Sequence, residues 1–336
     1  MGLFNKKKLK VKLKVDNNSG YDPWVGNNSS STYSIANFLD YLDNKPIGDS
    51  NDSYPRYVSY DLNIHNPIKM HNQLLCDGYL IPAPPSVVLQ SLSVAELKSI
   101  LQQHNLSTVG KKAVLIQSII DNVAIDNIGL KTFFTLSSKG EAYVNKFHYY
   151  IDVRPYLSKG IFSLQEFEER KNKQSYLSVE DLVWFIYNDK YSYYSINYHH
   201  EFLRNINYGR YELLLNEGKK KDALVFLLAT IYFDINGTSK FHNYADFNIN
   251  NTLASNVFEL SQEYDETVLK KVYRIAQSAI GMSIITASKP QSHCNTLILY
   301  ETFSRDILED IFQKLLHGNN VDLDYYKQYA NPKCFS

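Results

Sequence analysis

The chain has 336 residues, a length that corresponds to about two domains. Its 35 Lys and Arg residues balance its 35 Asp and Glu residues, which excludes a uniformly basic nucleic-acid coat protein but allows a local basic patch. A hydrophobic content of 44% is enough for a sizeable core and argues against global disorder.

The cysteines and the apolar runs predict the cellular compartment of the protein. Cys76, Cys294 and Cys334 lie far apart, and no pair has the spacing of a zinc site. We therefore expect reduced thiols in a cytoplasmic protein, with no metal and no cofactor. No apolar run approaches the roughly 20 residues of a membrane span, and the basic N-terminus lacks the apolar stretch of a signal peptide. We expect no contact with a membrane.

Residues 1–33 are expected to form a basic tail and an Asn/Ser-rich linker. Apolar and Lys residues alternate from Leu9 to Val15, which fits either an edge strand with a charged face or a mobile tail that contacts phosphate. The candidate secondary DNA contacts are Lys6, Lys7, Lys8, Lys10, Lys12 and Lys14. After a short helix near residue 34, the prolines of the segment 34–90 predict an irregular lead-in.

The segment 91–123 predicts two short helices joined by a loop. Ser93 can cap the first helix, and Glu96 three residues later can close a capping box. Asn105 can end this helix in a left-handed conformation, and Leu106 would fill the space between the helices. The expected buried positions are Val94, Leu97, Ile100 and Leu101 in the first helix, and Leu115, Ile116, Ile119 and Ile120 in the second.

The start of the second helix is the candidate site for DNA. The first turn of a helix presents free N–H groups and the positive end of the helix dipole, which suit phosphate oxygens. Gly110 allows the backbone to approach closely, and the adjacent lysines add charge at that point. The candidate DNA-contacting residues are Lys98, His104, Thr108, Gly110, Lys111 and Lys112.

This pattern resembles the SAP domain, a small helix–extended loop–helix module that binds DNA. The matching positions are Leu92, Ala95, Glu96, Leu97, Lys98, Leu101, Leu106, Gly110, Lys111, Lys112, Ala113, Leu115 and Ile116. The resemblance implies backbone-directed, weakly sequence-specific contact with duplex DNA, with AT-rich DNA preferred. There are two departures from the family pattern, Gln117-Ser118 in place of a basic residue and Asn105 in place of a glycine. The missing cation implies weak affinity of this module alone. A hairpin that serves only packing or protein contacts stays an alternative.

A short α/β extension is expected over 124–162, with a strand at Thr132–Leu136 and a helix from Ser138 to Phe147. Gly78-Tyr79-Leu80 before the hairpin and the segment 134–140 after it resemble SAP-containing proteins of low-GC Gram-positive bacteria and their phages. This resemblance implies a bacterial or phage setting and carries no mechanism.

Residues 163–336 predict an α-helical interaction domain, so the chain as a whole is expected to be mainly α, an α+β chain with minor strands. The segment 208–234 resembles a tetratricopeptide-like helical hairpin. Gly218, Ala223 and Asp234 stand where such a hairpin has its glycine, its small packing residue and its terminal acid. The resemblance implies that this domain recruits a protein partner or mediates self-association.

Tyrosines crowd into one stretch of this half of the chain. They fit either a stacking platform for single-stranded nucleic acid or the packing of helix faces. Packing is favoured because Arg204 and Arg210 are the only arginines nearby. The tyrosines concerned are Tyr187, Tyr191, Tyr193, Tyr194, Tyr198, Tyr208 and Tyr211.

No enzyme is predicted. The sequence lacks a phosphate-binding P-loop, a dinucleotide-binding glycine motif and a zinc-protease motif. Asp77 with Glu96 and Lys98 imitates a restriction-type nuclease signature, yet Glu96 falls where a helix cap is expected. The favoured hypothesis is a non-enzymatic protein that binds double-stranded DNA. A protein-interaction scaffold without DNA binding and a nuclease are the alternatives.

Overall fold

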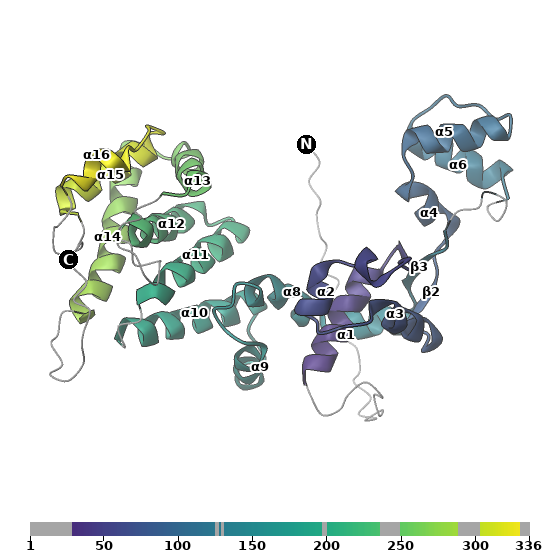
Figure 1. The fold of residues 1–336 in the computed structure, drawn as a ribbon, viewed down its shortest axis with the longest axis horizontal. Coiled ribbons are helices and arrows are strands. Elements are labelled where there is room, and N and C mark those ends of the chain that lie inside the picture. Colours follow the sequence, from purple (N-terminus) through teal and green to yellow (C-terminus); the bar gives the residue numbers. More distant parts are fainter. Residues whose placement is uncertain are drawn as a thin grey trace. The chain divides into compact units, whose positions relative to one another are not determined.

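The computed structural model describes residues 29–124, 128, 131–196, 200–235, 249–287 and 303–329. These residues form helices and one small sheet, which confirms the predicted class, mainly α with minor strands (Figure 1). The chain divides into two compact units, an N-terminal unit of Met1–His148 and a C-terminal unit of Tyr149–Ser336. The Lys-rich segment 1–15 lies outside the described residues.

The N-terminal unit alternates short helices with three strands. Its elements are α1 (Ser29–Leu42), β1 (Lys45–Pro46), the 3-10 helix η1 (Asn51–Ser53), α2 (Arg56–Tyr60), α3 (Pro67–Cys76), β2 (Leu80–Pro82), α4 (Pro85–Ser91), α5 (Val94–Gln103), α6 (Lys112–Asn122), β3 (Phe133–Leu136) and α7 (Ser138–Lys146). Helix α8 (His148–Leu157) spans the division between the units.

The irregular lead-in predicted for 34–90 is wrong beyond the expected helix near residue 34, because this segment also holds three further α-helices, the 3-10 helix η1 and two strands. Four of its six prolines stand at helix starts instead of breaking helices. Pro55 and Pro84 stand at N-caps, and Pro67 and Pro85 occupy the first helical position, where the missing N–H costs no hydrogen bond.

The sheet brings together two segments that are far apart in the sequence. The strand order is β1-β3-β2, and both pairs are antiparallel. Leu80 of β2 faces Leu136 of β3, and the N–H of Ala83 donates to the carbonyl of Phe133 at 2.8 Å. The chain therefore leaves β2 and returns to β3 at neighbouring points, with α4, α5 and α6 between them. The strand predicted at Thr132–Leu136 is confirmed.

A buried histidine joins helices and sheet in the N-terminal unit. The Tyr54 hydroxyl lies 3.0 Å from His71 Nδ1, and the Phe134 ring packs edge-on against the imidazole at 5.9 Å. His71 has no exposed surface, and burial lowers its pKa to about 4. The imidazole is therefore neutral at physiological pH.

This burial predicts a pH-dependent stability of the N-terminal unit. Because the folded state holds His71 with a pKa near 4 while the unfolded chain has the ordinary value near 6.5, stability is full above pH 6.5 and falls as pH drops toward 4. We expect a loss of about 2 kcal/mol between pH 7.5 and pH 5. Hydrogen exchange of α1 and α3 amides, corrected for intrinsic rates, measures it. The variant His71→Leu should lose this pH dependence, and an equally steep dependence in the variant would contradict the assignment.

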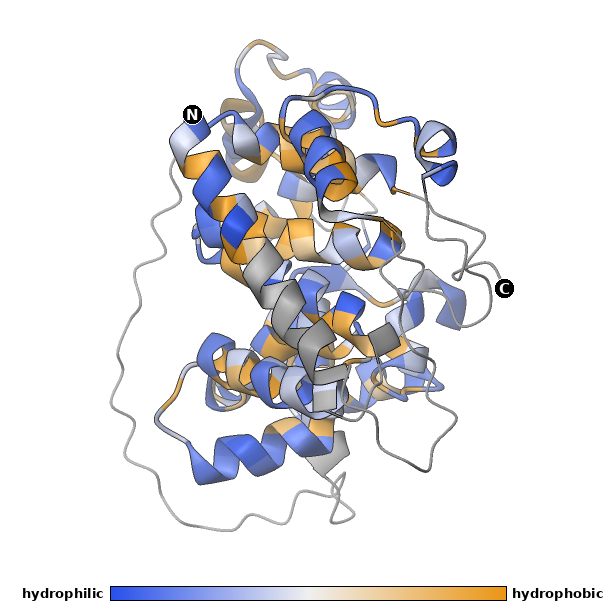
Figure 2. Cartoon of the chain, turned by 90° about the vertical axis from the view of Figure 1, so that its left-hand side faces the viewer, coloured by the Kyte–Doolittle hydropathy of each residue, from blue (hydrophilic) through white to orange (hydrophobic). Residues whose placement is uncertain are grey.

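The C-terminal unit is built around one apolar helix. Helix α12 (Lys220–Ile235) is buried along most of its length and packs against α11, α13 and α14. The other helices of this unit contribute buried hydrophobic residues to two cores. They are α9 (Leu164–Lys173), α10 (Val179–Ile196), α11 (His200–Asn216), α13 (Asn251–Ser261), α14 (Glu266–Ala287), α15 (Arg305–Leu316) and α16 (Leu323–Lys327). Figure 2 shows hydrophobic segments gathered between helices of the chain.

Helices α11 and α12 form the helical hairpin that the segment 208–234 predicted. Gly218 ends α11 with a φ of +76°, and the N–H of Lys219 donates to the carbonyl of Leu214 at 2.8 Å, which is a Schellman ending. Ala223 is fully buried in the core of this unit. Asp234 binds the Arg204 guanidinium through two hydrogen bonds of 3.0 and 3.1 Å. Kinship with tetratricopeptide repeats stays a prediction.

The tyrosines of the described stretch serve packing. Tyr187 and Tyr211 are buried, and Tyr191, Tyr194 and Tyr208 pack against the apolar cores. The Tyr191 ring also covers the buried Arg210 guanidinium at 4.3 Å. Asn188 accepts a hydrogen bond of 2.7 Å from that guanidinium. Burial lowers the pKa of Arg210 to about 10. Tyr193 is 58% exposed, and Tyr198 lies outside the described residues.

Candidate nucleic-acid interface

The α5–α6 hairpin has a small core that needs α4. Two short helices bury too little apolar surface to be stable alone. Leu89 of α4 supplies a fully buried side chain, and Leu92 packs at the edge of the core. The buried side chains are Leu89, Leu97, Ile100, Leu101, Leu115, Ile116, Ile119 and Val123. The predicted burial of Leu97, Ile100, Leu101, Leu115, Ile116 and Ile119 is confirmed, and Ile120 is half-buried against the same core.

Helix α5 begins with the predicted capping box. The Ser93 hydroxyl accepts the N–H of Glu96 at 3.2 Å, and the Glu96 carboxylate accepts the N–H of Ser93 at 2.7 Å. These hydrogen bonds from Ser93, with the nearby charge of Lys112, hold the pKa of Glu96 below its ordinary value. Burial of Val94 was predicted wrongly. Its side chain is 42% exposed, since the buried contacts of α5 begin one turn later at Leu97.

The turn after α5 has the geometry that the sequence predicts. Asn105 adopts a φ of +54°, the left-handed conformation. The N–H of Leu106 then donates to the carbonyl of Leu101 at 2.8 Å, and the Leu106 side chain packs against the hairpin core. Asn105 therefore replaces the expected glycine without loss of the turn.

Helix α6 starts without a side-chain cap. Gly110 has a φ of +138°, which L side chains rarely adopt, and a Cβ there would lie 3.0 Å from Val114 Cγ1. Lys111 follows as the N-cap, and within the described hairpin no side chain accepts from the first turn of α6. The N–H of Val114 donates to the carbonyl of Lys111 at 2.9 Å, and the N–H groups of Lys112 and Ala113 are the ones available to an anion.

The lysines at this helix start differ in their surroundings. Lys111 is exposed, whereas Lys112 is half-buried and its Nζ donates to the carbonyl of Gln90 in α4 at 2.8 Å. An ammonium group has three N–H donors, and a carbonyl does not neutralise its charge. Lys112 can therefore hold α4 against α6 and still attract phosphate.

The remaining candidates lie around this helix start. Thr108 is half-buried in the loop, Lys98 is exposed on α5, and His104 is exposed at the end of α5. Thr108, Gly110, Lys111 and Lys112 thus share one loop and helix start, while Lys98 and His104 lie on the neighbouring helix. Their role in binding DNA stays a prediction.

Sequence reasoning missed three features of this surface. Val109 and Val114, 82% and 56% exposed, flank Gly110 and place apolar surface beside the lysines. Gln90 was missed because α4 was predicted as irregular chain. The available signal was Pro84-Pro85 followed by an apolar run, which is typical of a helix start.

Comparison with protein-family models gives this hairpin its family. A SAP domain lies at residues 88–124. The match begins inside α4, three residues before the predicted segment 91–123, in agreement with the packing of Leu89 against α5 and α6. SAP domains are generally DNA-binding modules. No curated protein and no solved structure matches the chain.

The described residues hold neither a membrane-spanning helix nor a cluster of metal ligands. None of their helices combines the length and apolar character needed to cross a bilayer. No three His, Cys, Asp or Glu side chains gather in those residues where they could hold a metal ion.

The capping box predicts the effect of one substitution on the SAP domain. Ser93→Ala removes the acceptor for the N–H of Glu96, and we expect the domain to lose about 1 kcal/mol of stability. Hydrogen exchange of the α5 and α6 amides measures this loss. Ser99→Ala, an exposed mid-helix position, is the control and should change little. Equal effects of the two substitutions would show that the cap contributes nothing.

Proposed function

We propose that this protein binds duplex DNA through its SAP domain, with the start of α6 against the phosphate backbone. One observation carries the proposal: the uncapped first turn of α6 follows Gly110 and stands beside Lys111 and Lys112 in a domain of a DNA-binding family. Backbone amides and ammonium groups would share one or two phosphates there.

This mode of contact sets the expected specificity. Phosphate contacts position a protein on DNA without reading bases, so binding is salt-dependent and weakly sequence-specific. A preference for AT-rich DNA would arise from groove shape. The exposed Val109 adds a surface that suits contact with sugar rather than with phosphate.

The proposal includes no catalytic step. Glu96 of the nuclease-like signature is engaged in the α5 cap, and an Asp77 carboxylate oxygen accepts from Gln73 Nε2 at 3.1 Å. The C-terminal unit would recruit a protein partner or a second copy to DNA. We also propose, from the resemblance of the flanking segments, that the protein acts in the bacterial cytoplasm as a cellular or phage protein.

Charge reversal at the helix start tests DNA binding directly. Lys111→Glu/Lys112→Glu should abolish duplex binding at low salt, because both charges change sign where phosphate is expected. Fluorescence anisotropy with AT-rich, GC-rich and single-stranded DNA across a salt series measures it. The matched control is Lys270→Glu/Lys271→Glu, an exposed adjacent pair on α14, which should retain binding. Wild-type protein that binds no DNA at low salt would overturn the proposal and leave the protein-interaction scaffold.

Single neutral substitutions separate charge from packing. Lys111→Gln should weaken DNA binding and reduce the slope of log binding constant against log salt concentration by about one. It should leave stability unchanged, since Lys111 is exposed. Lys112→Gln should also lower the stability of the SAP domain, because the hydrogen bond to Gln90 is weakened. Hydrogen exchange of α4 and α6 beside the DNA titration distinguishes the two variants. Identical behaviour in both measurements would contradict the different surroundings of the lysines.

A further inference from the structure

A recess in the C-terminal unit lies between α10, α11, α12 and α14. Its volume is about 470 Å³, and apolar side chains form most of its lining. Trp184 and Phe226 meet edge-to-face at 5.7 Å, with Leu214 and Val225 buried beside them. Ile275 of α14 is 43% exposed and lies in this apolar groove.

Acidic side chains line the same groove. Asp181 comes from the start of α10, Glu217 from just after α11, and Asp222 from the first turn of α12. Among the lining residues the single cation is Lys219, whose Nζ lies 2.7 Å from the Glu217 carboxylate. The buried Arg210 guanidinium lies 5.6 Å from the Trp184 ring and 5.3 Å from the Phe226 ring, so it leaves the three carboxylates in excess of the two cations. The hydrogen bond to Glu217, with the charges of Asp181 and Asp222 nearby, raises the pKa of Lys219. The groove thus joins an apolar surface to an excess of negative charge.

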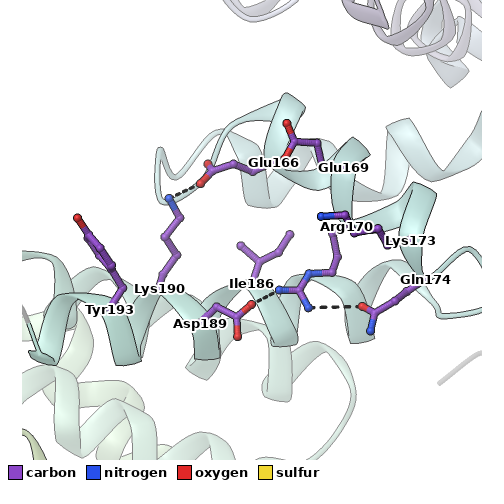
Figure 3. Close-up of a pocket in the computed structure, with 9 residues that line it drawn as sticks. All are labelled: Glu166, Glu169, Arg170, Lys173, Gln174, Ile186, Asp189, Lys190 and Tyr193. Atoms are coloured by element: carbon purple, nitrogen blue, oxygen red, sulfur yellow. Dashed lines mark hydrogen bonds and ion pairs between the residues drawn. The ribbon is translucent and has the colours of Figure 1, made fainter.

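The larger recess between α9 and α10 has a different character. Its volume is about 780 Å³, and three acidic side chains face three basic ones. Four of these six pair within it: Lys190 with Glu166, and Arg170 with Asp189 (Figure 3). Arg170 also reaches Gln174 at 3.5 Å. A partner there would have to separate these pairs, so this recess lacks the unbalanced charge that selects a ligand.

We propose that the acidic groove of Trp184, Phe226, Asp181, Glu217 and Asp222 binds an amphipathic helix of a partner protein, with large apolar side chains flanked by Lys or Arg. This inference rests on the proposed role of the C-terminal unit in recruiting a protein, and it names the chemistry of that partner. The apolar anchors would fill the space over Trp184 and Phe226, and the basic side chains would pair with the acids.

A helical partner suits this surface better than an extended one. An extended peptide needs a strand edge for its backbone hydrogen bonds, and the described part of the C-terminal unit contains no strand. A helix satisfies its own backbone and presents apolar side chains at i, i+3, i+4 and i+7 on one face. The groove between helices accepts such a face.

The test uses the full chain and a defined probe. The probe is a stapled helical peptide of about 16 residues, with leucine on one face and lysine on the flanks, beside a twin with glutamate flanks. In a Trp24→Phe background Trp184 is the one remaining tryptophan, and its fluorescence reports binding at the groove. We expect a saturable change with the lysine peptide that salt weakens, and no change with the glutamate peptide.

Charge reversal supplies the specificity control. Glu217→Lys/Asp222→Lys should lower the affinity for the lysine peptide by about tenfold or more and create affinity for the glutamate peptide. An unfolded variant would not gain this second affinity. Glu259→Lys/Glu309→Lys makes the same charge change at exposed positions outside the groove and should retain the wild-type preference. No binding of the lysine peptide to wild type, or equal loss in both variants, would overturn the inference.

Failure at the groove is distinguishable from failure of DNA binding. Glu217→Lys/Asp222→Lys leaves the SAP domain untouched, so the AT-rich duplex titration of the same sample reads the proposed function separately. Normal duplex binding without peptide binding overturns only the groove, and peptide binding without duplex binding overturns only the DNA contact.

Discussion

The pairing of β2 with β3 is the constraint on which the SAP domain depends. The two strands are short, but their antiparallel register places Leu80 opposite Leu136 and closes the chain from α4 to α6 into one loop. The closure extends past the strands, since Ser137 donates to the carbonyl of Gly78 through its hydroxyl at 2.6 Å. Closing a long loop costs little more entropy than closing a short one, so a sheet of this size can hold the domain at both ends.

Inside that loop, packing and electrostatics act on the same few residues. Helices α4, α5 and α6 pack together through their shared apolar core. The loop from α5 to α6 contains the left-handed Asn105 and the positive φ of Gly110. Lys112 serves both purposes, because its Nζ binds the carbonyl of Gln90 while its charge remains at the helix start. A surface for phosphate is thus produced by the packing that stabilises the domain.

The sequence predicts those features of the fold and the site that depend on residues close together in the chain. Helix caps, the turn at Asn105 and the buried face of α6 follow from neighbouring residues, and the sequence predicts them correctly. The pairing of β2 with β3 joins segments about 50 residues apart, and no local pattern at Leu80–Pro82 predicts it. The sequence predicts the helix near residue 34 but not α2, α3 and α4, because proline also breaks helices, whereas here Pro67 and Pro85 stand at helix starts. The acidic groove needs four helices at once, so it lies beyond sequence reasoning.

The measurement that tests the central claim most directly is amide chemical-shift mapping of the isotope-labelled full chain with an AT-rich duplex. If the start of α6 contacts phosphate, the largest shifts fall on Gly110, Lys111, Lys112 and Ala113, and they vanish as salt is raised. The account is contradicted if these amides stay unperturbed while the duplex binds, or if the shifts gather on the C-terminal unit.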